Sequence, residues 1–512
     1  MDKFIFYTCP KVSDLSKDCF PFHCNLLNPK IFYMEHLIGR SAERKQLEDM
    51  LQSGQSELYA VVGRRRVGKT FLIRQSLKHA LVFEFTGIHG ALMKEQLTNF
   101  AMALAKAVKI KGPLQIPESW QMAFYFLDSC LLEQLDPRKP AVVFFNEFPW
   151  IHSPKSNFLR AFDHWWNTSA SRYPHLKVII CGSTASWMIE KVYKDRGGLH
   201  NRVTGKIRLM PFSLAEASAF LRSKGVRLDQ TQTLEIYMAM GGIPYYLQHI
   251  KTQESAAQYI DRMCLDPQGI LSAEFHNLYH ALFRNAILHE KVIRELSKKP
   301  MGLTRTEILN ACGKSSGGSY SKTLEELEES GFIAPYIPFG KKANDSIYRL
   351  TDEYSLFYLK FIANGHQTKG GWLQLLGTST YKVWSGLAFE SVCLKHSRQM
   401  KAALGIEGMS TQESTWRSAG LKQNNSEGAQ IDLVIDRADG CINVCEIKFS
   451  SRVFEITKSY ARELDRKLEV FRARTATSKT LFLTLITTHG LKKNTYSSGL
   501  VQAEIVLEQL FT

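Results

Sequence analysis

The octapeptide GRRRVGKT at residues 63–70 constrains this chain more than any other segment. It follows a short apolar strand, ELYAVV, and leads directly into the helical sequence FLIRQSLKHA. The pattern G-x-x-x-x-G-K-[ST] between a strand and a helix predicts a loop whose backbone N–H groups hold phosphates at the positive end of the helix dipole. Lys69 would reach the β- and γ-phosphates, and the Thr70 hydroxyl would bind Mg²⁺. The expected phosphate-binding residues are Gly63, Arg64, Arg65, Arg66, Val67, Gly68, Lys69 and Thr70.

Three consecutive arginines lie within this loop, and two interpretations of them stay open. Arg64, Arg65 and Arg66 could contact a nucleotide or a neighbouring subunit. They could equally be solvated loop charges, and we expect this for at least two of the three.

A second segment, AVVFFNEFPW at residues 141–150, supplies polar residues at the end of an apolar strand. A continuous apolar run is typical of a buried parallel strand, and open α/β sheets bind ligands at the carboxyl ends of their strands. Asn146 and Glu147 end this strand, and Ser183 and Thr184 end the next apolar run, LKVIICGSTASW. We expect Ser183 beside the γ-phosphate, Asn146 with Thr70 at the metal, and Glu147 orienting an attacking water. Compared with an aspartate carboxylate, the Asn146 side chain keeps one acceptor oxygen but has no charge.

The motifs IGR, GRRRVGKT, VVFFNEFPW, CGSTASWM, LHNRVTGKIRLMPFSL and GGIPYYL occur in this order over about residues 35–250. Together they resemble the prokaryotic ATPases related to the AAA+ and STAND groups, called the archaeal ATPase family. The resemblance implies a doubly wound P-loop domain with a helical lid. It also implies a sensor role for Ser183, a place near the adenine for Pro244, and Arg202 as a candidate arginine finger. The family carries aspartate where Asn146 stands, so we expect ATP binding with slow turnover.

Residues 281–355 read as three helices followed by a hairpin, the layout of a winged helix. Thr304 and Glu307 form a capping box for the second helix, and Gly331 ends the third. Such a domain places its third helix in the DNA major groove, but four glutamates on this helix would repel phosphates. They are Glu325, Glu326, Glu328 and Glu329. We therefore favour protein–protein packing, with the start of the helix and the turn at Lys341 and Lys342 as the parts able to approach DNA.

Near the C-terminus, AQIDLVIDRADGCINVCEIKFSS predicts two strands joined by the turn RADG, because Asp-Gly is a strong hairpin signal. Side chains alternate along a strand. We therefore expect Asp432, Val434 and Asp436 on one face of the first strand. Glu446 and Lys448 are expected to share a face of the second.

This hairpin, with Glu390 in the helical segment upstream, resembles the restriction-endonuclease-like nucleases, whose signature is an acidic residue, then Asp, then Glu-x-Lys. The resemblance implies that Glu390, Asp432 and Glu446 bind Mg²⁺ and that Lys448 activates water or stabilises the phosphate. Hard oxygen ligands and a positive charge at the phosphate are what such chemistry needs. The alternative is a relic hairpin in which Glu446 and Lys448 make a salt bridge.

Composition limits the partners and the compartment. A net charge of +16 favours a polyanionic partner, either nucleic acid or a phosphorylated ligand, with dispersed lysines as the alternative. Ten scattered cysteines without a CxxC pair fit a reducing, cytoplasmic protein. A run of about 18 apolar residues, which a transmembrane helix needs, is missing, and so is a secretory signal.

At 512 residues the chain is too long for one core. We expect an N-terminal extension without a motif, or a stretch that is not translated, at 1–33. A P-loop ATPase core at 34–210, a helical lid at 211–280, a winged helix at 281–355 and a nuclease-like α/β domain at 356–512 follow. The sequence predicts an ATP-binding AAA+/STAND-type protein, a slow ATPase that gates a DNA-associated, Mg²⁺-dependent nuclease-like domain. The alternative is an ATP-switched regulatory or scaffold protein with an inactive nuclease-like domain. The expected partners are ATP, DNA, a protein bound through the winged helix and a second copy of the chain, without a membrane.

Overall fold

The computed structural model describes residues 37–512, apart from 111, 113–114, 154, 184, 194–198, 284, 314–316, 364, 366–367 and 419–427. The expected extension at 1–33 lies outside the described residues. The chain separates into two units, Met1–His36 and Leu37–Thr512, and every described residue belongs to the second. Within these residues no helix has the length and apolar character that crossing a bilayer requires.

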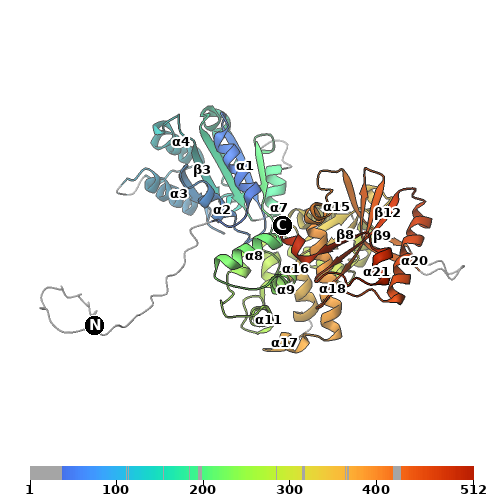
Figure 1. The fold of residues 1–512 in the computed structure, drawn as a ribbon. Coiled ribbons are helices and arrows are strands. Elements are labelled where there is room, and N and C mark those ends of the chain that lie inside the picture. The colour runs from blue at the N-terminus through green and yellow to red at the C-terminus, as the bar shows by residue number, and fades with distance from the viewer. Residues whose placement is uncertain are drawn as a thin grey trace, which may run out of the picture. The chain divides into compact units, whose positions relative to one another are not determined.

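A five-stranded parallel sheet forms the first part of the described unit (Figure 1). Its strands are β1 Glu57–Val62, β2 Leu81–Thr86, β3 Ala141–Asn146, β4 Leu176–Gly182 and β5 Gly205–Arg208. They lie in the order β2-β3-β4-β1-β5, and all pairings are parallel. Every residue of β3 and β4 is buried, as expected for apolar strands in a sheet covered on both faces. The predicted α/β fold around the glycine-rich motif is therefore confirmed.

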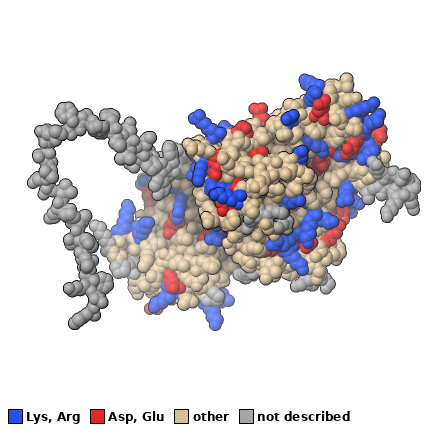
Figure 2. Space-filling model, turned by 90° about the horizontal axis from the view of Figure 1, so that it is seen from below, with Lys and Arg blue, Asp and Glu red and all other residues tan. Residues whose placement is uncertain are grey.

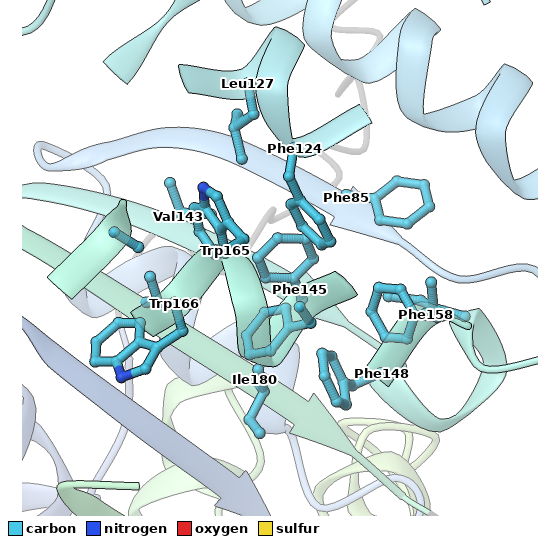
Figure 3. Close-up of a cluster of buried hydrophobic side chains, with 14 of the residues drawn as sticks. Phe85, Phe124, Leu127, Val143, Phe145, Phe148, Phe158, Trp165, Trp166 and Ile180 are labelled. Atoms are coloured by element: carbon cyan, nitrogen blue, oxygen red, sulfur yellow. The ribbon is translucent and has the colours of Figure 1, made fainter. Parts of the chain in front are cut away.

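An aromatic core fixes the carboxyl end of β3. Phe145 of β3 and Phe148 just after it both contact Phe162, with ring centroids 5.5 and 5.1 Å away, and Phe124 stacks on Trp165 (Figure 3). Glu147 lies between the two buried phenylalanines, so its backbone position is set by their packing. The helices of this part are α1 Ser41–Gln52, α2 Lys69–Ser76, α3 Met93–Ala107, α4 Trp120–Cys130, α5 Phe148–Ile151, α6 Phe158–Thr168 and α7 Ala185–Met188.

The segment expected to form a lid is helical. Its helices are α8 Leu214–Ser223, α9 Gln230–Met240, α10 Pro244–Leu247, α11 Ala256–Ile260 and α12 Glu274–Leu282. A capping box of Ser213 and Glu216 starts α8, and α9 ends at Gly241, whose φ of 67° suits glycine. Helicity is confirmed here, and the role as a lid stays a prediction.

A small antiparallel sheet with three helices follows. The helices are α13 Ala286–Ser297, α14 Arg305–Ala311 and α15 Gly317–Glu329, and the strands β6 Leu303–Thr304, β7 Ile333–Tyr336 and β8 Ile347–Leu350 lie in the order β6-β8-β7. The capping box of Thr304 and Glu307 is present. Arg208 of β5 donates to the carbonyl oxygens of Glu328 and Glu329, so the end of α15 packs against the first sheet. This contact lies within the chain, so the expected binding of a protein partner through the winged helix stays a prediction.

The last part holds a mixed sheet in the order β13-β12-β11-β10-β9. The strands β9 Thr411–Ser418, β10 Ala429–Arg437 and β11 Cys441–Lys448 are antiparallel, and β12 Thr480–Thr487 and β13 Ala503–Val506 continue in parallel. The hairpin predicted around RADG is confirmed, with Val434 opposite Val444. Its helices are α16 Glu353–Phe357, α17 Gly371–Leu375, α18 Ser379–Lys395, α19 Ser397–Ala403, α20 Lys458–Thr475 and α21 Thr495–Leu500.

Side chains do not alternate regularly between the two faces at the start of β10, so the prediction of regular alternation is wrong there. The register between β9 and β10 shifts between Ile431 and Val434. These two residues are three positions apart, yet both belong to the cluster that contains Phe471 of α20. A bulge of this kind inserts an extra residue and re-aims the neighbouring side chain. That side chain is Asp432, whose Oδ2 accepts a hydrogen bond from the backbone N–H of Ile447 at 3.0 Å.

Candidate functional site

Two glycines give the loop between β1 and α2 its shape. Gly63 and Gly68 have φ of 156° and 93°, values that side chains disfavour. A Cβ on Gly63 would lie 2.4 Å from the carbonyl oxygen of Leu209, so the backbones approach too closely for any side chain. Gly68 directly precedes α2, which leaves the first N–H groups of that helix directed into the loop.

The motif lysine lies within the curve of this loop. Lys69 is buried, and its Nζ donates to the carbonyl oxygens of Gly63 at 2.8 Å and Arg64 at 3.0 Å. Burial is the largest influence on the Lys69 pKa and lowers it, with the Glu147 carboxylate opposing this effect. The ammonium is therefore held by weak neutral acceptors, which a phosphate oxygen can replace.

Asn146 connects the loop to the second strand. Its Oδ1 accepts a hydrogen bond from the Thr70 hydroxyl at 3.0 Å, and its Nδ2 donates to the Thr86 hydroxyl at 3.3 Å. The predicted pairing of Thr70 with Asn146 thus exists, with the amide oxygen directed toward the threonine. Two neutral oxygen donors meet here, the ligand type that Mg²⁺ prefers, so the residues fit the ion without supplying charge.

Glu147 and Ser183 form a second polar pair at this edge. The Ser183 hydroxyl donates to Glu147 Oε2 at 3.0 Å. Glu147 has φ 48° and ψ 48°, an uncommon left-handed conformation that recurs at functional sites. Thr184 lies outside the described residues. The structure therefore brings together the predicted residues of this edge, which are Lys69, Thr70, Asn146, Glu147 and Ser183.

The first loop arginine is buried rather than solvated. Arg64 is 3% exposed, and its Nη1 lies 2.6 Å from Asp352 Oδ1. Its guanidinium also lies over the Phe332 ring, 4.9 Å from the centroid. Asp352 caps α16, since its Oδ2 accepts from the N–H and hydroxyl of Ser355. Arg64 and Ser355 hold the pKa of Asp352 low, although burial acts in the opposite direction as the largest influence.

The third loop arginine also has a protein partner. Arg66 forms an ion pair with Glu274 of α12, and its guanidinium lies 4.3 Å from the ring centroid of Tyr245 in α10. The expectation that at least two loop arginines are solvated is therefore wrong, because Arg65 alone is exposed. The partners of Arg64 and Arg66 come from distant segments that no local pattern reveals.

The segment GGIP is docked against the backbone at Phe212, which belongs to the motif LHNRVTGKIRLMPFSL. Phe212 N–H donates to the Gly242 carbonyl at 2.7 Å, and a Cβ on Gly242 would lie 2.0 Å from the Phe212 oxygen. Arg40, of the motif IGR, places its guanidinium 4.4 Å from the Phe212 ring centroid and donates to the Val67 carbonyl at 3.3 Å. Arg40 thus joins the phosphate loop to Phe212, the residue on which the GGIP segment is docked. The only sequence signal for Arg40 was its place in the motif IGR.

Arg202 lies on the turn before β5. Its Nε is 3.9 Å from Asp163 Oδ1 of α6, and its side chain is about half exposed. Among the described residues, Arg202 thus has its ion-pair partner on α6 and not at the phosphate loop. The arginine-finger role stays a prediction.

The C-terminal acidic residues form a second buried polar site. Burial raises the pKa of Asp432 to about 7, and the charges of Glu446 and Glu390 act in the same direction. The Glu390 Oε1 accepts from Arg349 Nη2 of β8 at 2.7 Å, and both side chains are buried. Arg349 therefore neutralises Glu390, which the sequence placed among the metal ligands.

Glu446 is surrounded by donors. Its Oε1 accepts from Lys467 Nζ at 2.8 Å, and its Oε2 accepts from Lys448 Nζ and the Tyr460 hydroxyl at 3.3 Å each. The salt bridge of the relic-hairpin interpretation is thus present. In the described part of the chain, three or more His, Cys, Asp or Glu side chains are nowhere close enough together to hold a metal. Glu390, Asp432 and Glu446 do not fit Mg²⁺ in this arrangement, and their role as ligands stays a prediction.

The raised Asp432 pKa gives a measurable effect on stability. The folded pKa of about 7 exceeds the ordinary aspartate value of about 3.9, so ionisation opposes folding as pH rises through this range. We expect Asp432→Asn to increase the free energy of unfolding by roughly 2 to 4 kcal/mol at pH 8 and to change it little at pH 4. Urea denaturation at both pH values measures this, and an equal change at both would contradict it.

The fold and the first site together define a P-loop ATPase domain: a parallel sheet, a glycine-rich loop before a helix, a buried lysine, and polar pairs at two neighbouring strand ends. Residues 37–250 match the family model described as an ATPase domain predominantly from Archaea. The match covers residues 37–250 alone, and an ATPase domain of this kind implies nucleotide binding.

Individual proteins are also similar to this chain. An uncharacterised protein from Methanocaldococcus jannaschii is 26% identical over 334 residues, which cover 64% of this chain and 68% of that protein. A Walker-type ATPase from Pyrococcus abyssi aligns at 18% identity and a TM-score of 0.46, covering 64% of this chain and 97% of that structure. The ORC2 protein of Aeropyrum pernix aligns at 15% identity and a TM-score of 0.37, covering 64% of this chain and 94% of that structure.

Proposed function

We propose that the chain is an ATP-binding switch with slow hydrolysis that controls a nuclease-like site acting on DNA. The observation that carries this proposal is a short segment, residues 349–352, that begins within β8. Arg349 of this segment holds Glu390, and Asp352, three residues later, holds Arg64 of the phosphate loop. Two side chains from one short stretch of the chain thus form ion pairs, one with a residue of each site.

The nucleotide chemistry follows from the first site. Lys69 would exchange the two loop carbonyls for phosphate oxygens, and the N-terminus of α2 would hold the same phosphates. Mg²⁺, when bound through Thr70 and Asn146, would neutralise charge on the phosphates. Glu147, fixed by the Ser183 hydroxyl, would orient a water for attack. Because Asn146 brings no charge, we expect a long-lived ATP-bound state.

Communication with the second site would run through the Arg349–Asp352 segment. A phosphate bound in the loop competes with Asp352 for Arg64, since both are anions that attract the same guanidinium. Glu353 adds a further tie, with its Oε1 2.6 Å from Lys395 Nζ on α18, the helix that also carries Glu390. Movement of this segment would withdraw Arg349 and leave Glu390 free to join Asp432 and Glu446.

Binding of ATP is tested by calorimetry with wild type and Lys69→Ala. Loss of one charged hydrogen-bonding group to phosphate costs about 1.5 to 3 kcal/mol, so we expect the Kd for ATP to rise by roughly 10- to 100-fold. Lys78→Ala, an exposed lysine beyond the end of α2, is the matched control and should leave the Kd unchanged. Equal ATP affinity in wild type and Lys69→Ala would refute the nucleotide site.

The alternative function is an ATP-switched regulatory or scaffold protein with an inactive nuclease-like domain. The salt bridge between Lys448 and Glu446, and the separated carboxylates, favour it. A plasmid-nicking assay with Mg²⁺, with and without ATP, separates the two. Nicking that Asp432→Ala and Lys448→Ala both abolish supports the nuclease, whereas ATP-dependent partner binding without nicking supports the regulatory protein.

A further inference from the structure

Two adjoining hollows lie beside the nucleotide site, with volumes of about 800 and 640 Å³. They share four lining residues, so they form one continuous depression, which we call the Trp150 groove. The shared residues are His89, Pro149, Trp150 and His152. Arg65 and Trp187 extend the groove on one side, and Lys94 and Lys155 on the other.

The charge of this groove differs from that of the surface at large. Figure 2 shows Lys and Arg spread over the viewed face with Asp and Glu among them, as dispersed lysines would produce. By contrast, none of the described residues that line the two hollows is Asp or Glu. Arg65, Lys94 and Lys155 are all exposed. A concave surface lined by one sign of charge attracts polyanions.

His280 contributes less positive charge to the groove than the arginine and the lysines. His280 lines the first hollow, but its Nε2 lies 3.9 Å from Glu290 Oε1 on α13, so its charge is compensated when protonated. The attraction of the groove for a polyanion therefore comes from the arginine and the two lysines.

Aromatic rings lie between these charges. The His89 and Trp150 rings meet edge to face with centroids 5.2 Å apart, and the His152 and Trp187 centroids are 5.9 Å apart. Trp150 is half-buried, so its ring is held by the protein while part of it faces the groove. Stacking of bases on aromatic side chains, next to a positively charged track for the backbone, is the usual design of single-strand binding surfaces.

A buried amide fixes the walls of the groove. Gln96 is fully buried, and its side chain bonds both the N–H and the carbonyl of Ile88, at 3.1 and 2.7 Å. The same Nε2 donates to the carbonyl of Trp150 at 2.9 Å. One glutamine thus ties the loop that carries His89 to the helix that carries Trp150. The spacing of the two rings is therefore set before any ligand binds.

The groove is also attached to the hydrolytic residues. Gly87 N–H donates to the Asn146 carbonyl at 3.0 Å, and Trp150 N–H donates to the Glu147 carbonyl at 2.8 Å. A Cβ on Gly87 would lie 2.8 Å from the Glu147 oxygen, so this approach requires glycine. A ligand that moves His89 or Trp150 would therefore displace the backbone of the residues that we assign to metal and water.

We propose that the Trp150 groove binds single-stranded nucleic acid, with phosphates on Arg65, Lys94 and Lys155 and bases against Trp150 and His89. A duplex keeps its bases stacked inside and offers them no access to these rings, and an acidic peptide has no base to stack. The inference rests on the proposed function only for its association with DNA, and ATP binding is not needed for it.

The test is fluorescence anisotropy of a labelled oligothymidylate with the full chain at several salt concentrations. For Lys94→Gln combined with Lys155→Gln we expect about 10-fold weaker binding, and a salt slope smaller by about 1.4 because two phosphate contacts are lost. The matched control combines Lys45→Gln with Lys139→Gln, two exposed lysines outside the groove that cause the same change in net charge. This control should bind like wild type.

Stacking is tested separately at the tryptophan. Trp150→Leu should weaken oligothymidylate binding by about 10-fold, whereas Trp150→Phe, which keeps an aromatic face, should retain most of it. The lysine pair is exposed, so its result stands even if a Trp150 variant fails to fold. Calorimetry with ATP on the lysine variants should give the wild-type Kd, which keeps this test distinct from that of the nucleotide site.

Three results would overturn the inference. The first is equal binding of oligothymidylate by wild type and the lysine pair at every salt concentration. The second is an equal loss in the control pair, which would mean that net charge alone governs binding. The third is displacement of the oligonucleotide by polyglutamate of the same charge, or equal affinity for duplex DNA, since neither presents a base for stacking.

Discussion

Replacing Asn146 by aspartate should raise the rate of Mg²⁺-dependent ATP hydrolysis by about 100-fold. The Asn146 Oδ1 already accepts from Thr70, so an aspartate would occupy the same place and add a negative charge at the metal. A unit charge about 4 Å from another is worth about 4 kcal/mol at an effective dielectric near 20. Bound water and the other phosphates reduce this to roughly 3 kcal/mol, which corresponds to the expected factor.

Phosphate release under saturating ATP measures this rate. The Kd for ATP should change little, because Lys69 and the loop N–H groups carry nucleotide binding. Glu147→Gln is the control: added to Asn146→Asp, it should return the rate to the wild-type level or below, since water is then no longer oriented. Brisk hydrolysis by wild type, with no gain in Asn146→Asp, would mean that Asn146 does not limit turnover.

Removing the Arg64 side chain should destabilise the fold by about 3 to 5 kcal/mol, because Asp352 would then remain buried without its partner. Arg64→Ala, followed by urea denaturation near neutral pH, measures this loss. The control is Arg74→Ala, which breaks the more exposed pair with Glu84. We expect a change below about 1 kcal/mol there.

The buried pair can also be removed as a whole. Arg64→Met combined with Asp352→Asn leaves no charge behind and keeps an acceptor for the N–H of Ser355, so most of the stability should return. In this double variant, ATP should no longer alter hydrogen exchange at residues 349–353. An unchanged exchange response to ATP would show that communication takes another route.

Local patterns predicted the parts of the molecule that depend on local geometry. The strand–loop–helix around Lys69, the turn in RADG and the capping box at Thr304 all follow from the conformational needs of neighbouring residues. The edge where Asn146 and Glu147 lie followed from a general rule, that parallel strands present ligands at their carboxyl ends.

Side-chain pairings between residues far apart in the sequence could not be predicted from local patterns. Arg64 meets Asp352 across 288 positions, and Arg66 meets Glu274 across 208, so nothing near the arginines marks them as buried. The Trp150 groove likewise joins separate segments of the chain, including Arg65, His89 and Trp150. The bulge in β10 was missed for another reason. The order of residue types along this strand is the same whether or not one residue is left unpaired, so the sequence pattern does not reveal the bulge.

The short distance along the chain between Arg349 and Asp352 has a thermodynamic consequence. If ATP weakens the hold of Arg349 on Glu390 by some factor, then any ligand that draws Glu390 away from Arg349 must tighten ATP binding by the same factor, because the two equilibria share one cycle. A divalent cation or a DNA phosphate at the C-terminal hairpin would then act as an effector of the phosphate loop, and its occupancy could be measured from the nucleotide dissociation constant alone.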